Sequence, residues 1–252
     1  PQPPRPVHPR PAPDDYLVPG ERAVVELLRA DPRRVRRLLA LPDRCPEAID
    51  LATARGVPVD VCTPDAMAAV ISLELARGVV AIARPPRLWD LQELLEQAAL
   101  EGRKRLLVAL DGVQDPHNLG AILRSAEFFG ARGVFWARDR SAPVTPTVVR
   151  SSAGATERLP LCQVTNLARA LAEAKEAGYW VLGTVAEGGA DLRQLARDGF
   201  PDAMVVVLGS EGTGLRRLTR ESCDFLATIP GAGGVASLNV SAAAAVTLAS
   251  LV

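Results

Sequence analysis

The stretch LLVALDGVQDPHNLGAILRSAEFFGARG, residues 106–133, decides the fold. It opens with a continuous apolar run of the kind found in parallel strands that are buried on both faces. A glycine turn follows, and then the pattern predicts a helix over Leu119–Phe129, with Asn118 as its N-cap and Gly130 as its stop. Arg124 falls off the apolar face of that helix, so its side chain is free to point at a site. The stretch is therefore typical of a strand and helix in an α/β sheet.

Two further segments place glycine and polar residues directly after an apolar strand. They are VVVLGSEGTGL, residues 205–215, and IPGAGGVASLNVSAAAA, residues 229–245. In open α/β sheets, ligands bind at the carboxyl ends of the strands. One such segment alone is compatible with an ordinary surface turn. Three in one chain favour a shared ligand site.

Several common kinds of site are poorly supported. No G-x-G-x-x-G follows any of these strands, and no G-x-x-x-x-G-K-[ST] occurs in the chain, so the usual dinucleotide and triphosphate cradles are not expected. The two histidines are His8 and His117, and no G-x-S-x-G accompanies them, which argues against a serine hydrolase. The cysteines lie far apart and form no C-x-x-C, so we expect no metal site and no disulfide framework, but reduced thiols in a cytoplasmic protein; they are Cys45, Cys62, Cys162 and Cys223.

The composition is that of a globular protein with no net charge. Apolar residues make up 48% and charged residues 23% of the 252 residues, and no stretch is long and apolar enough for a membrane helix. Nearly all the positive charge is arginine, because Lys104 and Lys175 are the only lysines. A local basic cluster is formed by Arg33, Arg34, Arg36 and Arg37. Such a cluster is either a patch that binds phosphates or the solvent-exposed edge of a helix or strand.

The chain divides into four parts. Residues 1–15 are rich in proline, lack the apolar core of a signal peptide and are expected to form a disordered leader. Residues 16–84 alternate between helices and strands and predict a small α/β domain, and 85–104 is expected to be a linker that contains a helix near Leu91–Leu100. Residues 105–252 predict a larger α/β domain. Its last helix, from about Leu238 to Ser250, is so apolar that we expect it to be buried against the sheet or a second subunit.

The ordered set of motifs resembles the SpoU family of RNA methyltransferases. Asp115–Gly120 followed by Arg124-Ser125-Ala126 resembles the first motif of that family, Leu208–Gly212 the second, and Ile229-Pro230 with Ser237–Ser241 the third. The match covers about 105–252. The unit over 16–84 resembles the small domain, similar to a ribosomal protein of the L30e type, that bacterial 23S rRNA guanosine-2′-O-methyltransferases of this family carry.

The resemblance implies an S-adenosylmethionine-dependent methylation of a ribose 2′-hydroxyl in RNA, most simply a guanosine of 23S rRNA. It also implies a parallel sheet whose C-terminal part is threaded into a deep trefoil knot, and a homodimer formed through the knotted region. The chain departs from the family pattern at Gly231, where methionine is usual, and at Ala76-Arg77, where His-Gln is frequent. The second departure leaves the RNA target open.

The resemblance also assigns roles to residues. Arg124 is the first candidate for catalysis, as a group that holds the RNA phosphate and stabilises the forming oxyanion, because an arginine is almost always protonated. The other catalytic candidates are Asn118, Glu211, Ser237 and Asn239. The adenosine site is carried over to Gly209, Ile229 and Leu238, with Thr184 as a weaker addition. RNA contacts are expected at Arg33, Arg34, Arg36, Arg37 and His117, although His117 is equally compatible with a turn residue beside Pro116.

Three alternatives stay open from the sequence. A tRNA ribose methyltransferase of the same family would keep the chemistry and change the substrate. A ribosome-assembly factor that binds RNA without catalysis would not need the complete set Asn118, Arg124, Glu211 and Asn239. A small-molecule methyltransferase would leave the front domain unexplained.

Overall fold

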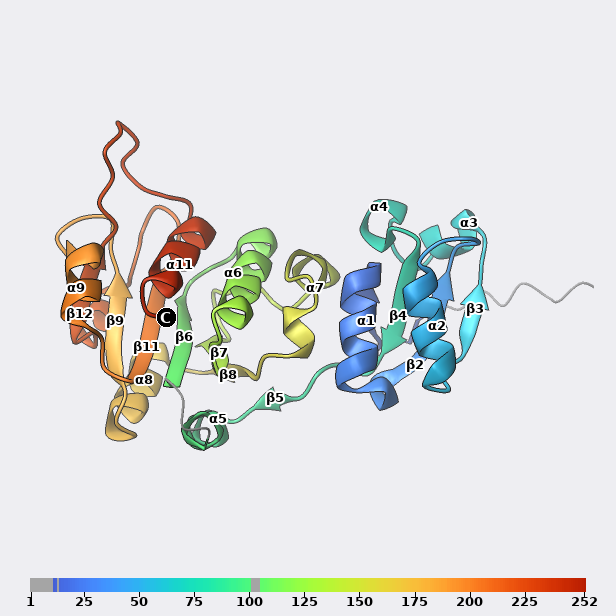
Figure 1. Ribbon diagram of the computed structural model, residues 1–252, viewed down its shortest axis with the longest axis horizontal. Coiled ribbons are helices and arrows are strands. Elements are labelled where there is room, and N and C mark those ends of the chain that lie inside the picture. Colours follow the sequence, from blue (N-terminus) through green and yellow to red (C-terminus); the bar gives the residue numbers. More distant parts are fainter. Residues whose placement is uncertain (1–10, 13, 101–104) are drawn as a thin grey trace, which may run out of the picture. The chain divides into compact units, whose positions relative to one another are not determined.

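The structure, a computed structural model, describes residues 11–12, 14–100 and 105–252, which form two compact units (Figure 1). The smaller unit consists of the described residues up to Pro86 together with Val144–Arg158. The larger unit consists of the described residues of Arg87–Pro143 and of Leu159–Val252. The predicted leader over 1–15 lies mostly outside the described residues. No helix in the described part of the chain is long and apolar enough to cross a membrane.

The larger unit is built on an eight-stranded sheet in which every neighbouring pair of strands is parallel, with the order β10-β12-β9-β11-β6-β7-β8-β5. This confirms the predicted parallel α/β sheet. The central strand β6 is buried on both faces from Leu106 to Asp111, as its continuous apolar run predicted. The strands are β5 (Leu88–Trp89), β6 (Arg105–Asp111), β7 (Gly133–Ala137), β8 (Leu161–Val164), β9 (Trp180–Thr184), β10 (Ala190–Asp191), β11 (Ala203–Gly209) and β12 (Phe225–Thr228).

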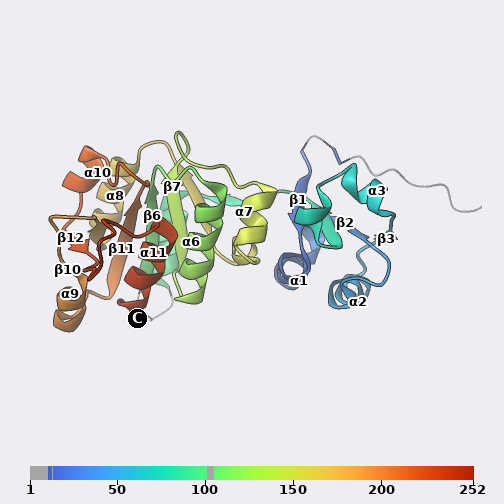
Figure 2. The ribbon, with the colours of Figure 1, turned by 90° about the horizontal axis from the view of Figure 1, so that it is seen from above.

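Helices cover both faces of this sheet (Figure 2). The apolar sides of α5 and α8 pack with alternate residues of the central strands in one core cluster. On the other face α6 and α11 lie side by side (Figure 1). The final helix is only partly covered, because Val246 is 41% exposed while Ala244 and Leu248 are buried. The helices are α5 (Leu91–Ala99), α6 (Pro116–Phe128), α8 (Leu167–Glu176), α9 (Leu192–Asp198), α10 (Arg217–Glu221) and α11 (Val240–Ala249).

Helix α6 begins earlier than the sequence analysis expected. Its N-cap is Asp115, whose Oδ1 accepts a hydrogen bond from the backbone N of His117 at 3.0 Å, and Pro116 occupies the first helical position. An aspartate before a proline suits these two positions better than an N-cap at Asn118, because proline lacks the N–H that would stay unpaired there. The expected cap at Asn118 is therefore wrong. Its side chain lies in the first turn and is left available for other contacts.

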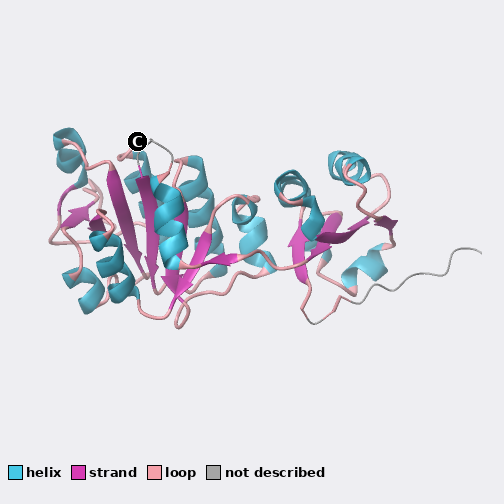
Figure 3. Ribbon diagram, turned by 90° about the horizontal axis from the view of Figure 1, so that it is seen from below, coloured by secondary structure: helices cyan, strands magenta, loops and turns pink. Residues whose placement is uncertain are grey.

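The smaller unit has a mixed sheet with the strand order β1-β4-β2-β3 (Figure 3). Helices α1 and α2 pack on one face, and α3 and α4 pack on the other. Strand β1 pairs antiparallel with β4 and was not predicted, since its four residues end in Pro19 and carry too short a pattern. The elements are β1 (Tyr16–Pro19), α1 (Glu21–Ala30), β2 (Val35–Ala40), α2 (Pro46–Ala54), β3 (Val59–Val61), α3 (Pro64–Ala68), α4 (Leu73–Ala76) and β4 (Val79–Ala83).

The segment Val144–Arg158, which follows β7 in the chain, is part of the smaller unit. Its helix α7 (Pro146–Ser151) places the fully buried Val149 in the core beneath α1 and α2. After α7, Glu157 lies in a short 3-10 turn with its carboxylate fully buried, 2.6 Å from Nη1 of Arg34. Burial raises the pKa of the Glu157 carboxyl, so desolvation offsets much of the attraction to Arg34, but removing Arg34 would leave the buried carboxylate without its counter-charge.

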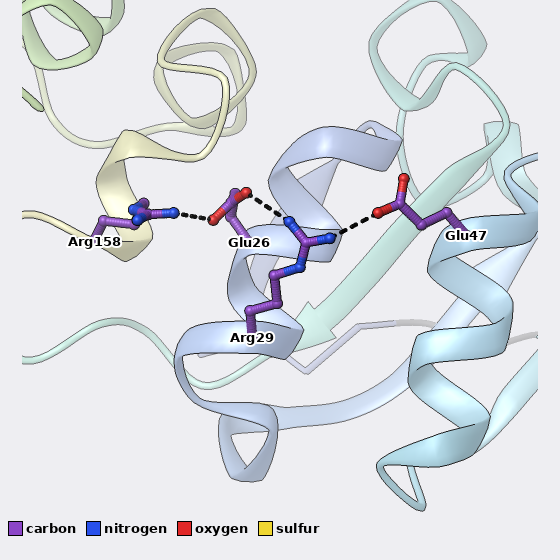
Figure 4. A network of polar contacts seen from close by, with 4 residues as sticks. All are labelled: Glu26, Arg29, Glu47 and Arg158. Atoms are coloured by element: carbon purple, nitrogen blue, oxygen red, sulfur yellow. Dashed lines mark hydrogen bonds and ion pairs between the residues drawn. The ribbon is translucent and has the colours of Figure 1, made fainter. Parts of the chain in front are cut away.

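A surface network fastens the same segment to α1 and α2 (Figure 4). Arg158 Nη1 lies 2.7 Å from Glu26, whose carboxylate also contacts Arg29. Arg29 in turn reaches Glu47 of α2 at 2.9 Å. Exposed pairs of this kind each contribute at most about 1 kcal/mol, so the buried apolar contacts carry most of the attachment.

Candidate functional site

A cavity of about 360 Å³ lies in the larger unit at the carboxyl ends of β9, β11 and β12. This size lies in the range of about 300–1,000 Å³ that is typical of small-molecule sites. Two of the three glycine-containing segments, 205–215 and 229–245, line the cavity, whereas the first, over 106–133, contributes no lining residue. The lining residues come from the end of β9 (Thr184, Val185, Ala186), the turn after β11 (Gly209, Ser210, Glu211, Gly212, Gly214) and the segment from Ile229 to α11 (Ile229, Ala236, Ser237, Leu238, Asn239, Val240, Ala243).

The turn after β11 doubles back tightly beneath the cavity. Ser210 and Gly214 exchange two backbone hydrogen bonds, at 3.2 and 3.0 Å. A Cβ on Gly209 would stand 2.6 Å from both the carbonyl oxygen of Gly214 and the backbone N of Leu215. No side chain fits there, so the close approach of two backbone segments requires glycine at 209.

Three polar side chains, one from each motif, meet beside the cavity. Asn118 on α6 donates from Nδ2 to Oε1 of Glu211 at 3.0 Å, and Asn239 donates to the same oxygen at 2.6 Å. The third contact joins Nδ2 of Asn239 to Oδ1 of Asn118 at 3.0 Å. Since hydrogen bonds to a charged acceptor are about twice as strong as neutral ones, the two amides hold the Glu211 carboxylate in one place.

Asn239 has a second role as the N-cap of α11. Its Oδ1 accepts from the backbone N of Ser241 at 2.9 Å and from the Ser241 hydroxyl at 2.6 Å. The side chain therefore joins the start of α11 to the turn after β11. The cap fixes the amide so that its N–H groups face Glu211 and Asn118.

An ion pair between a buried aspartate and a partly exposed arginine holds the C-terminal end of the turn. Asp111, the last residue of β6, is 1% exposed and accepts from the backbone N of Arg216 at 2.8 Å and from its Nε at 2.5 Å. Strands β6 and β11 are neighbours, and Asp111 stands in register with Gly209. The turn from Gly209 to Arg216 is thus held at both ends. Sequence reasoning missed this pair, although an acidic residue that directly follows an apolar strand was the available signal.

The remaining candidates lie in or near the same region. Thr184 lines the cavity and donates its hydroxyl to the carbonyl of Val207 at 3.2 Å. Ile229, Ser237 and Leu238 also line it, and Leu238 is 51% exposed.

Arg124 is not among the residues that line the cavity. It is exposed on α6, about two turns along the helix from Asn118, and makes no hydrogen bond or ion pair within the described part of the chain. Its guanidinium is therefore free to take a ligand from solvent. His117 is exposed in the first turn of the same helix.

The basic cluster near the start of the chain is largely occupied by internal partners. Arg34 pairs with Glu157 as described, Arg36 lies 2.9 Å from Asp15, and Arg37 lies 3.5 Å from Asp60. Arg33 is exposed and has no such partner in the described ranges. The structure therefore does not bring the four guanidinium groups together as one open patch.

Comparison with known proteins places this architecture in a defined class. Residues 105–249 match the model of the SpoU rRNA Methylase family, and residues 17–89 match the model described as RNA 2′-O ribose methyltransferase substrate binding. The first match covers more than half of the chain. The chain belongs to the SpoU rRNA methylase family.

Individual relatives are similar over nearly the whole chain. The 23S rRNA (guanosine-2′-O-)-methyltransferase RlmB of Pseudomonas aeruginosa is 45% identical over 235 residues, which are 91% of this chain and 92% of that protein. The RlmB protein of Ralstonia nicotianae is 42% identical over 92% of this chain and 93% of its own length. Among solved structures, the SpoU methyltransferase AviRb of Streptomyces viridochromogenes in complex with AdoMet is 28% identical with a TM-score of 0.77, over 94% of this chain and 89% of that one.

Proposed function

We propose that this protein is a 23S rRNA guanosine-2′-O-methyltransferase that uses S-adenosylmethionine as the methyl donor. The observation that carries the proposal is the convergence of three motifs: one polar side chain from each hydrogen-bonds to the other two beside a cavity that the second and third motifs line. The identity of 42–45% to RlmB proteins over about nine-tenths of the chain favours 23S rRNA as the substrate over tRNA.

The lining of the cavity fits the proposed methyl donor. Adenosine is uncharged, and the backbone of Gly209, Ile229 and Leu238 offers N–H and C=O groups without a charged side chain. The glycine required at 209 leaves room for a ligand to approach the main chain. Glu211 places a carboxylate at the edge of the cavity, where it favours a cationic ligand. When bound, S-adenosylmethionine supplies an electrophilic methyl group on a sulfonium.

The residues of the chain then orient and activate the ribose. Arg124, which is exposed and has no partner within the described residues, grips the RNA phosphate next to the target and stabilises negative charge that develops on the 2′-oxygen. Asn118, Asn239 and Ser237 position the ribose and the methyl donor against each other. Positioning of this kind lowers the barrier by roughly 7–11 kcal/mol.

The assembly follows the family resemblance. The smaller unit, with its N-terminal part up to Pro86 and the segment Val144–Arg158, contributes RNA affinity, and the larger unit contributes catalysis. Threading of the C-terminal segment into a trefoil knot and pairing of two copies through the partly exposed face of α11 complete the enzyme, which acts in the cytoplasm. Arg33 and His117 remain exposed candidates for RNA contacts.

Methyl transfer to RNA tests the proposal directly. Purified protein is incubated with isotope-labelled S-adenosylmethionine and 23S rRNA or tRNA, and ribose methylation is mapped by resistance to alkaline cleavage. We expect one guanosine of 23S rRNA to be modified and tRNA to stay unmodified. Absence of label in both RNAs, although calorimetry shows binding of the methyl donor, would overturn the proposal.

A further inference from the structure

A second cavity, of about 280 Å³, lies at the same edge of the sheet, at the carboxyl ends of β7 and β8. It is lined by Ala137 at the end of β7, by Thr165 and Asn166 after β8, and by Arg216 and Arg217 at the start of α10. The reaction proposed above uses none of these side chains. The lining also includes Leu167, Ala168, Leu218 and Thr219, and its two guanidinium groups suit an anionic ligand.

Arg216 is fixed in place before any ligand arrives. The buried carboxylate of Asp111 holds its backbone N and its Nε, and no other partner contacts its two Nη groups in the part of the chain that the structure describes. The side chain is 43% exposed, so these Nη groups are reachable from solvent. A guanidinium presents a planar fork that matches the oxygens of a phosphate, and prior fixation lowers the entropy lost on binding.

Three more arginines lie nearby in the chain, of which Arg217 lines the cavity and the other two follow its lining residue Ala137. Arg217 is 75% exposed and pairs only with Glu221 one turn along α10, a contact weak enough for a phosphate to replace. Arg138 follows Ala137 directly, is exposed and has no ion pair among the described residues. Arg140, also exposed, adopts the left-handed conformation with φ 63°, which few residues other than glycine adopt. The four arginines stand against three carboxylates, those of Asp111, Asp139 and Glu221, which leaves an excess of positive charge.

The arginines continue the edge that holds the first cavity. A Cβ on Gly112 would lie 3.7 Å from Cβ of Ser210 and 3.9 Å from the carbonyl oxygen of Arg140, so the loop after β7 borders the turn after β11. In the sheet β6 and β7 separate β11 from β8. Gly214 lines the first cavity and Arg216 the second, so the two cavities border the same turn, two residues apart along the chain, and a short run of nucleotides covers this distance.

We propose that this second cavity binds the backbone of the RNA strand that flanks the methylated nucleotide, with Arg216 as the fixed phosphate ligand and Arg138 and Arg217 as its mobile neighbours. The inference rests on the proposed RNA methyltransferase activity and adds a substrate-binding subsite to it. The ligand is single-stranded RNA, because the flanking phosphates of a splayed-out ribose are accessible from one side.

The test is a double variant with a matched control. Arg138→Ala with Arg217→Ala removes one unpaired exposed arginine next to the lining residue Ala137 and one paired exposed arginine that lines the second cavity. The control, Arg193→Ala with Arg197→Ala, also removes one paired and one unpaired arginine, but at the far edge of the sheet. Arg193 pairs with Asp191 at 3.1 Å, and Arg197 is exposed with no ion pair among the described residues. RNA binding of the full chain is measured by filter retention over a range of salt concentrations, with S-adenosylmethionine affinity and methyl transfer measured on the same preparations.

We expect the cavity variant to bind RNA about tenfold more weakly, with a salt dependence of log K that is shallower by about 1.4, the value for two lost contacts to a single strand. The control variant should bind RNA like the wild type, and both should keep the affinity for S-adenosylmethionine. Equal RNA binding by the cavity variant and the wild type overturns the inference, as does an equal loss in the control, which would show an effect of net charge alone. If the wild type itself transfers no methyl group to RNA, the proposed function fails instead.

Discussion

The Asp111–Arg216 clamp yields a prediction that separates a positioning role from a purely stabilising one. The substitution Asp111→Asn keeps the shape of the side chain and one oxygen acceptor for the backbone N of Arg216, but its amide N–H groups oppose the Nε of the guanidinium. One charge-assisted hydrogen bond is lost, which costs about 1.5–3 kcal/mol. Because Arg216 is 43% exposed, water replaces part of this bond, and we place the cost near the lower end.

The loss falls on the turn that lines the first cavity, so it should appear in the binding of the methyl donor. The same bond exists in the protein without the donor, so the full cost of about 1.5 kcal/mol sets an upper bound of roughly tenfold on the loss of affinity. Calorimetric titration of the full chain with S-adenosylmethionine measures this change. Thermal unfolding of the same samples shows whether the variant is folded at the temperature of the titration.

Asp224 provides a matched control at the opposite end of the sheet. Its carboxylate also accepts from a backbone N, that of Val181 at 2.9 Å, and pairs with Lys175 at 2.6 Å. Asp224→Asn therefore removes the same kind of contact at the amino end of β9, away from the cavity. It should lower stability and leave the affinity for the methyl donor unchanged. Wild-type affinity in Asp111→Asn, or equal weakening in both variants, would refute the positioning role.

The remaining predictions concern four other residues. Gly209→Ala should abolish binding of S-adenosylmethionine in calorimetry because its Cβ meets the backbone of Gly214 and Leu215, whereas Gly233→Ala, with open space around its Cβ, should bind normally. Arg124→Ala should lose methyl transfer by orders of magnitude and keep donor affinity; near-normal turnover in the radiolabel assay would contradict its assignment. Arg34→Ala should lower the free energy of unfolding by about 3–5 kcal/mol in denaturant titrations, since it strands the buried Glu157 carboxylate. Burial raises the pKa of Tyr16 above its ordinary value of 10.0, so the unfolded chain releases the phenol proton at a lower pH than the folded chain does. The free energy of unfolding should therefore fall as the pH rises above 10. Tyr16→Phe should show a shallower fall, and the same pH profile in both proteins would exclude the mechanism.

The parts of the fold that the sequence predicted are those with a strong periodic or continuous apolar pattern. The strand predicted from the apolar run at Leu106 and the helix predicted near Leu91–Leu100 appear where the pattern placed them, as β6 and α5. The missed elements are short: β5 has two residues and β1 has four, too few for a period to show. Pairing with a distant strand creates them, and a local pattern does not report such pairing.

The candidate site shows the same division. One side chain from each of the three motifs converges, namely Asn118, Glu211 and Asn239, because the carboxyl ends of parallel strands meet at one edge, whereas Arg124 lies apart from the cavity. The network that organises them was not predictable, since a contact such as Asn118–Glu211 spans 93 positions of the chain. For the basic cluster near Arg34, adjacency in sequence suggested one shared surface. In the structure, strand alternation and separate carboxylate partners place Arg34, Arg36 and Arg37 in different environments.

The docking of Val144–Arg158 on the smaller unit has a consequence for modular engineering. The polypeptide passes from one unit to the other three times, near residues 86, 143 and 158. A truncated chain that starts at Arg87 would still carry α7, with Val149 stripped of its apolar surroundings and Glu157 of its counter-charge. Replacing the smaller unit by that of a homologue therefore requires the exchange of both the N-terminal part up to Pro86 and the segment Val144–Arg158. A chimera with a single crossover should aggregate.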